Sequence, residues 1–186
     1  MIHALARLKA QLPPALRRLI DDRRAVSAVE FAFVAPVLIT MYLGCVEVSD
    51  VVAVQRKVSL TAYTLANLTG QVTTISSTGM TNILNAATAI LTPYSASNAT
   101  LTVSCISFDA NKTMTVKWTA PSGSATLTPT VDSNLQVANT QLIYAEVTYN
   151  YTPIVGYQLT GNITLRDHMF MSPRISAPTW VSAACT

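Results

Sequence analysis

The sequence predicts an α+β fold in which a long N-terminal membrane-spanning helix is followed by an antiparallel β-sheet domain. Two observations carry this prediction. Residues 25–46 form an apolar run with a single charged residue, and from residue 99 onward the apolar residues recur at every second position. The first pattern is long enough for a transmembrane helix, and the second is typical of strands with one buried face.

Residues 1–25 form a basic arm that carries six of the chain's twelve Lys and Arg residues, whereas the first charges after the apolar run are Glu47 and Asp50. Because Lys and Arg remain on the cytoplasmic side of a membrane, we expect this arm to be a cytoplasmic leader and the residues after the span to be external. A removable secretory signal is the competing interpretation. The apolar run is longer than the usual core of about 7–15 residues and lacks a small-x-small site at its end, which favours a retained anchor.

Glu30 is the sole charge in the apolar run. At ~1.5 Å of rise per residue, a helix over residues 26–46 covers the ~30 Å of a bilayer's hydrocarbon core. Charged residues at the centre of such helices cost roughly 2.5–3.5 kcal/mol, so they usually have a partner or a function. The alternative is that Glu30, near the start of the run, reaches the headgroups at little cost. Six residues later, Pro36 removes a backbone hydrogen bond, which predicts a helix kink.

The helix is predicted to continue beyond the membrane through residues 47–70. Its apolar residues recur at spacings of three and four, so they lie on one stripe that can pack against a domain in water, and Gly70 is a plausible stop. The residues of this stripe are Val51, Val54, Val58, Ala62, Leu65 and Leu68.

Residues 71–186 are expected to form one external α+β sheet domain, since about 115 residues can build a core of their own. A second helix is predicted over residues 81–91, before Pro93. Alternating apolar residues predict an antiparallel hairpin and two further strands. The expected strands cover residues 101–105, 114–118, 141–151 and 162–171, and residues 119–133 are expected to be a loop.

Two cysteines, Cys105 and Cys185, fall in the external domain, while Cys45 falls in the span. Outside the cytoplasm the first two can pair, and a disulfide that closes so long a loop would contribute roughly 4 kcal/mol. The alternative is a buried Cys105 on a strand and a free thiol at Cys185.

The remaining composition gives little support to an enzyme or to a binding site for metal or nucleic acid. The two histidines, His3 and His168, are far apart, no Cys pair has zinc spacing, and there is no glycine-rich phosphate loop. Outside the arm the six basic residues form no larger basic cluster, which argues against nucleic acid. We therefore expect no catalytic residues, cofactor or metal, and we interpret His168 as a surface residue. Five Asn-x-Ser/Thr sites would allow an unrelated anchored glycoprotein, but chance matches are expected in a domain rich in Asn and Thr.

The N-terminal motif resembles the prepilin-peptidase site of type IV pilins. In such sites a small residue, normally Gly, precedes the cut, and Glu is the fifth residue after it. Here Ala25 takes the place of Gly, the cut would fall before Val26, and the acid is Glu30. The sequence VEFAFVAPVL around Glu30 and Pro36 further resembles the TadE-like family, minor pilin-like proteins of the tight adherence (Flp) pilus system.

Two pieces near the other end are similar to C-terminal motifs of the same family. They are Tyr-x-Tyr-x-Pro at Tyr149, Tyr151 and Pro153, and Pro-Arg at Pro173 and Arg174. The resemblance implies a bacterial inner-membrane protein with a periplasmic, pilin-like sheet domain, its function being pilus assembly or initiation.

The partners implied are a prepilin peptidase, other pilin or pseudopilin subunits, inner-membrane platform proteins and membrane lipid. Within this interpretation, Glu30 would neutralise the amine of a processed neighbouring subunit. Two alternatives remain open, namely an uncleaved membrane-anchored scaffold of the pilus machine and an external adhesin or binding module.

Overall fold

The computed structural model describes residues 23–121, 129–154, 161–181 and 183–185. The basic leader expected over residues 1–25 lies outside this range except for its last three residues. The chain divides into two compact units, Met1–Val46 and Glu47–Thr186, with the boundary inside the first described helix. Each unit is described by itself below.

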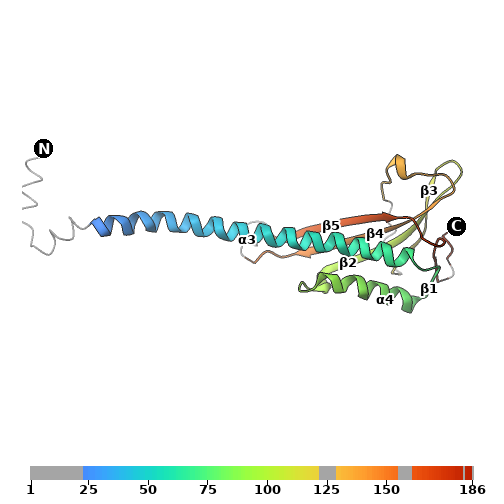
Figure 1. Ribbon diagram of the computed structural model, residues 1–186, viewed down its shortest axis with the longest axis horizontal. Coiled ribbons are helices and arrows are strands. Elements are labelled where there is room, and N and C mark those ends of the chain that lie inside the picture. Colours follow the sequence, from blue (N-terminus) through green and yellow to red (C-terminus); the bar gives the residue numbers. More distant parts are fainter. Residues whose placement is uncertain (1–22, 122–128, 155–160, 182, 186) are drawn as a thin grey trace, which may run out of the picture. The chain divides into compact units, whose positions relative to one another are not determined.

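The first described element is the 48-residue helix α3, Arg23–Gly70, drawn blue to green in Figure 1. It ends at the glycine that the sequence indicates as a stop. An 18-residue window of this helix is apolar and long enough to cross a membrane, and none of that window is buried. Pro36 lies inside the helix, and the Thr40 hydroxyl donates a hydrogen bond to the Pro36 carbonyl over 2.7 Å. The kink predicted at Pro36 stays a prediction.

The second unit is built on a four-stranded antiparallel sheet in the order β3-β2-β4-β5 (Figure 1). The strands are β2 Ala99–Phe108, β3 Met114–Ala120, β4 Gln141–Tyr151 and β5 Ile163–Met171. The long N-terminal helix followed by this antiparallel sheet confirms the predicted α+β fold. All four predicted strands are present, and β2 and β3 extend beyond their expected ends.

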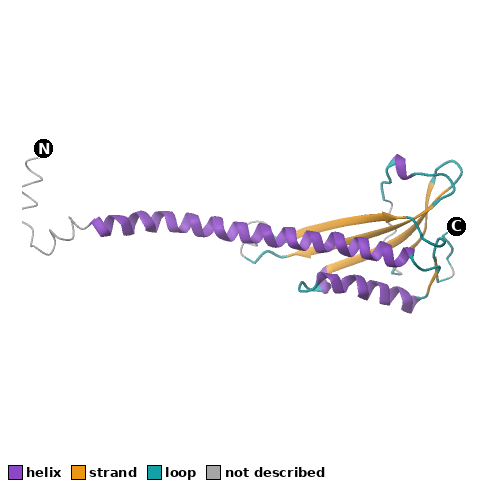
Figure 2. Cartoon of the chain, viewed as in Figure 1, coloured by secondary structure: helices purple, strands orange, loops and turns teal. Residues whose placement is uncertain are grey.

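Shorter elements complete the second unit (Figure 2). Helix α4, Ser77–Thr88, continues into the 3₁₀ turn η1, Ala89–Leu91, so the predicted helix begins four residues too late. Two further 3₁₀ turns are η2, Ala96–Asn98, and η3, Ser133–Leu135. The two-residue strands β1, Thr74–Ile75, and β6, Thr179–Trp180, pair in parallel and tie the C-terminal segment to the residues after α3.

One face of the sheet packs against the second half of α3 and against α4. Because successive residues of a strand point to opposite faces, Val103, Cys105, Ile143, Ala145 and Val147 share this face. They join the inner stripe of α3 in one hydrophobic core, whose helical members include Val54, Val58, Ala62, Leu65 and Ala66. Of the predicted stripe only Val51 and Leu68 are incompletely buried. The amphipathic stripe is therefore a packing surface, as the sequence indicates.

Polar contacts fix α3 between its neighbours. The Lys57 ammonium donates hydrogen bonds to the carbonyls of Ile90 and Thr92, over 3.0 and 2.6 Å, at the end of the α4–η1 helical segment. A cation at a helix C-terminus is favoured because the last carbonyls have no partner within the helix. On its other side, the Ser59 hydroxyl donates to the Asp167 carboxylate on β5.

The C-terminal segment is attached to the sheet by a disulfide between Cys105 on β2 and Cys185, with 5.9 Å between their Cα atoms. Both cysteines are fully buried in the main core. Nearby, Trp118 Nε1 donates a hydrogen bond to the Pro178 carbonyl over 3.0 Å, and the rings of Trp118 and Trp180 lie 5.9 Å apart. The tail thus covers part of the core.

Candidate functional site: the N-terminal helix and the outer face of the sheet

The predicted processing site and its acid occupy the start of α3. Ala25 and Val26 already lie within the helix, so the bond between them is in helical backbone. The Val26 side chain is 57% exposed, and Glu30 is exposed as well. Residues four apart lie on the same face of a helix, so Val26 and Glu30 are neighbours one turn apart. A second helix packed against this face would meet both residues.

A second exposed stripe lies on the outer side of α3 within the second unit. Val48 is 64% exposed, Val52 45%, Leu60 51% and Tyr63 43%, and the exposed Arg56 lies among them. At 3.6 residues per turn these positions fall on one side of the helix, opposite the stripe that packs on the sheet. Sequence reasoning missed this surface, although the spacing of four from Val48 through Leu60 could have revealed it.

The Tyr-x-Tyr-x-Pro piece lies at the end of β4. Tyr149 and Tyr151 are 3% and 7% exposed, and Pro153 is buried. Burial raises the pKa of Tyr151, and the charges of Glu47 and Asp50, where α3 begins its course in the second unit, raise it further. The motif therefore packs where the helix enters the domain.

The Pro-Arg piece lies at the other end of α3. The Arg174 backbone N–H donates to the Gly70 carbonyl over 2.9 Å, and its guanidinium donates to the Asn67 side-chain oxygen over 2.8 Å. The last carbonyls of a helix have no partner within the helix, so Arg174 caps α3. The two C-terminal motif pieces thus lie near opposite ends of the part of α3 that belongs to the second unit, a juxtaposition that spacing in the sequence does not reveal.

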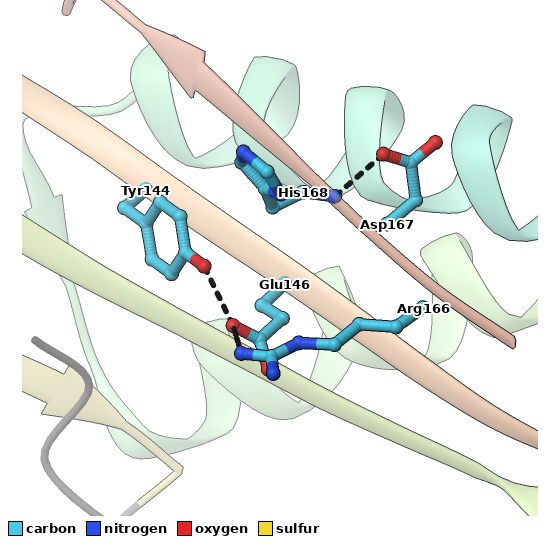
Figure 3. Close-up of polar contacts among 5 residues, drawn as sticks. All are labelled: Tyr144, Glu146, Arg166, Asp167 and His168. Carbon is cyan, nitrogen blue, oxygen red and sulfur yellow. Dashed lines mark hydrogen bonds and ion pairs between the residues drawn. The ribbon is translucent and has the colours of Figure 1, made fainter. Parts of the chain in front are cut away.

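The outer face of the sheet carries a charged cluster that the sequence analysis did not identify (Figure 3). Glu146 on β4 is only 8% exposed. Its Oε2 accepts hydrogen bonds from the Tyr144 hydroxyl and from Arg166 Nη2, each over 2.6 Å. Asp167 and His168 are neighbours on β5, and in Figure 3 their side chains point to opposite sides of the strand, as expected from their order in the sequence.

The pKa values of the cluster follow from these contacts. Burial raises the pKa of Tyr144 to about 12, helped by its hydrogen bond to Glu146. For Glu146, burial acts to raise the pKa, but the hydrogen bonds from Arg166 and Tyr144 together with the Arg166 charge outweigh it and lower the pKa. The hydrogen bond to Glu146 raises the pKa of Arg166. Glu146 and Arg166 are therefore an ion pair at neutral pH.

A cavity of about 440 Å³ opens beside this cluster, lined by Tyr144, Arg166 and His168 from the sheet and by Pro129 and Thr130 from the segment after β3. His168 is exposed, as its interpretation as a surface residue requires. The rest of the predicted loop over residues 119–133 lies partly outside the described residues. Within the described part of the chain, no group of three or more His, Cys, Asp or Glu could hold a metal ion.

The comparison with protein families gives one match, to the family described as TadE-like protein, over residues 25–67. The matched segment starts at the residue before the predicted cut and includes Glu30, Pro36, the apolar first half of α3 and most of its second half. No curated protein matches the chain. Among solved structures there is likewise no match.

Together with the apolar helix, the family match suggests a membrane anchor of the kind found in a single-pass protein. The pilus-associated TadE-like proteins are generally structural rather than enzymatic. The N-terminal helix of this chain is TadE-like, as its motif indicates, and the match points to involvement in the Tad pilus system.

Proposed function

We propose that this chain is a TadE-like minor pilin that takes part in the assembly or initiation of a Flp-type pilus. The observation that supports the proposal most is the start of α3, where a prepilin-peptidase motif and the acid Glu30 stand together in the segment that matches the family. The basic arm lies in the cytoplasm, α3 crosses the inner membrane, and the sheet domain lies in the periplasm. The charge difference across the span supports this topology.

Glu30 acts when a subunit joins the assembly. Cleavage before Val26 creates an α-amine at the end of the helix, inside or at the edge of the hydrocarbon. A neighbouring chain staggered by about one turn, ~5.4 Å, brings that amine to the Glu30 carboxylate. Attraction between the two charges is strong where water is scarce, and pairing offsets the cost of placing each of them in lipid.

The exposed stripe of α3 supports the same role. Val48, Val52, Leu60 and Tyr63 leave apolar surface on a helix that continues from the span. Contiguous exposed apolar surface marks interaction sites in soluble domains. A second helix that emerges from the same membrane in parallel would cover this stripe, so the helix can join an assembly both within and above the bilayer.

The test replaces Glu30 in cells that make the pilus. Glu30→Gln keeps the size of the side chain but removes its charge, and we expect normal membrane insertion with loss of pili. Glu30→Asp is the matched control, because it keeps the carboxylate on the same face and should retain most pili. Pili are counted by electron microscopy, and insertion is measured by protease accessibility of the periplasmic domain. Normal piliation with Glu30→Gln would refute the proposed role.

An uncleaved scaffold of the pilus machine is the second candidate. Two observations favour it, namely Ala25 in place of the usual Gly and the helical backbone at the predicted cut. In this role Glu30 would bind a polytopic platform protein instead of a neighbouring amine. An uncleaved chain also needs Glu30, so the N-terminal residue of the mature protein, not the Glu30 variants, separates the two candidates.

A further inference from the structure

The outer face of the sheet carries a cavity that the proposed assembly role of α3 does not use. Its lining residues Tyr144, Arg166 and His168 come from β4 and β5, whereas α3 packs on the opposite face of the sheet. The volume of about 440 Å³ falls within the range of cavities that hold small ligands or single side chains.

Two of the residues that line the cavity, Tyr144 and His168, belong to an aromatic cluster that also contains Phe170. Ring centroids lie 5.7 Å apart for Tyr144 and His168, 4.9 Å for Tyr144 and Phe170, and 5.6 Å for His168 and Phe170. Tyr144 also belongs to a second buried hydrophobic cluster with Ile106, Phe108 and Val131, and Phe170 packs against that cluster. Because these side chains already hold one another, a ligand would lose little free energy in ordering them.

The cation beside these rings keeps much of its surface exposed. Glu146 binds Arg166 at a single terminal nitrogen, Nη2, and the Arg166 side chain remains 59% exposed. A guanidinium has five N–H donors arranged as a planar fork that matches the two oxygens of a carboxylate. Among the described residues, those that line the cavity include no acid. The exposed donors can therefore take a second carboxylate.

We propose that this cavity binds a carboxylate side chain from an extended acidic segment of a partner protein. One arginine that already shares its charge with Glu146 suits a monoanion better than a phosphate, which usually requires several cations or backbone N–H groups. The apolar stem of a Glu or Asp side chain packs on the rings of Tyr144 and His168 while its oxygens meet Arg166. The sheet domain thus has a binding site of its own, separate from the helix.

The contacts predict opposite effects for two substitutions in the same ion pair. Arg166→Gln removes the charged donors, so we expect affinity to fall about tenfold or more, because hydrogen bonds to a charged group are lost at a site that remains partly exposed. Glu146→Gln removes the internal competitor for the guanidinium, so we expect affinity to rise. Arg56→Gln removes the same charge from α3 and should have no effect. If Arg166 and Glu146 served only to stabilise the fold, the two substitutions would not change the affinity for the peptide in opposite directions.

The experiment titrates the isotope-labelled full-length chain in detergent micelles with a blocked peptide of alternating Gly and Glu, and follows the backbone amide signals of Arg166 and His168. We expect the amide signals to shift in a saturable way with this peptide. We expect no shift with the peptide that carries Gln in place of Glu. Near-UV circular dichroism checks that each variant is folded. The proposal would be overturned if the Gln peptide bound equally well or if binding did not saturate at millimolar peptide. It would also be overturned if inorganic phosphate bound as tightly as the peptide, or if Arg166→Gln left the affinity unchanged.

Discussion

Two acids, Glu30 and Glu146, have different surroundings in the chain. Glu146 is 8% exposed and receives hydrogen bonds from Tyr144 and Arg166 on the same sheet. Glu30 is exposed on α3, in a helix that has the length and composition of a membrane span. A buried acid can be stabilised within its own domain, whereas an acid that faces lipid gains most from a partner on another helix.

The cluster around Glu146 predicts how stability depends on pH. The folded-state pKa of Glu146 is lowered, so its contribution is fully present above the ordinary Glu pKa of about 4.3 and is lost as the pH falls through the folded-state value. Glu146→Gln should therefore lower the free energy of unfolding at pH 7 by only about 1 kcal/mol, since the Arg166 partner is largely exposed. Because the variant has no carboxylate to protonate at this position, it should lose less stability than wild type as the pH falls.

The measurement is the thermal unfolding midpoint of the full chain in detergent, followed by near-UV circular dichroism from pH 7 to pH 3. Tyr144→Phe is the matched variant, because it keeps the Glu146 carboxylate but removes one of its two donors, so its acid sensitivity should fall between wild type and Glu146→Gln. If Glu146→Gln loses stability in acid as steeply as wild type, the ion pair does not govern this dependence.

At the scale of elements, α3 is the organising part of the second unit. Its inner stripe packs on the sheet, Lys57 holds the end of the α4–η1 segment, and Arg174 caps its last turn. The outer stripe, with Leu60 and Tyr63, has apolar side chains that remain exposed. The helix is therefore packed along one side and exposes apolar side chains on the other, where the proposed assembly contact would form.

A substitution in the outer stripe of α3 can test the proposed assembly role without disturbing the fold. Leu60 is 51% exposed, so Leu60→Gln should change stability by no more than about 0.5 kcal/mol, as is usual for surface substitutions. It should nevertheless reduce piliation and the amount of this chain that purifies with pilus components. Leu135→Gln on η3 is the control, since Leu135 is 42% exposed away from α3. Normal assembly with Leu60→Gln would show that the stripe is not an interface.

The elements also show what local patterns can predict. The end of α3 at Gly70 and the bounds of β4 agree with the sequence, because both rest on strong periodic signals. The first turn of α4 was missed, since Thr78 and Gly79 are poor helix formers. The Ser76 side chain compensates by accepting a hydrogen bond from the Gly79 N–H over 3.0 Å. Strands β1 and β6 are too short to give a pattern.

The outer-face cluster could not be predicted because it depends on strand register. Tyr144 and Glu146 are two apart on β4, which places them on one face, and this much is visible in the sequence. Arg166 joins them only because β4 and β5 pair with Glu146 opposite His168, so that Arg166 lies on the diagonal. That register follows from the packing of the whole domain, as does the contact of Arg174 with the end of α3.

At the scale of the whole molecule, the two regions differ in what they contribute. The TadE-like segment over residues 25–67 contains the apolar helix that suggests a membrane anchor, together with the proposed assembly contacts. The sheet packs against the second half of α3 and carries a separate cavity on its outer face. The central claim is that processing before Val26 prepares the helix for assembly through Glu30, because only a processed chain has an amine one turn away from a neighbour's acid.

The most direct test is the N-terminal residue of the protein purified from its native membrane, determined by intact mass and terminal sequencing. The account predicts a start at Val26. A start at Met1 would contradict processing and leave a permanently anchored scaffold as the better description, and a start beyond Cys45 would show that the span is a removable signal and that the proposed anchor is wrong.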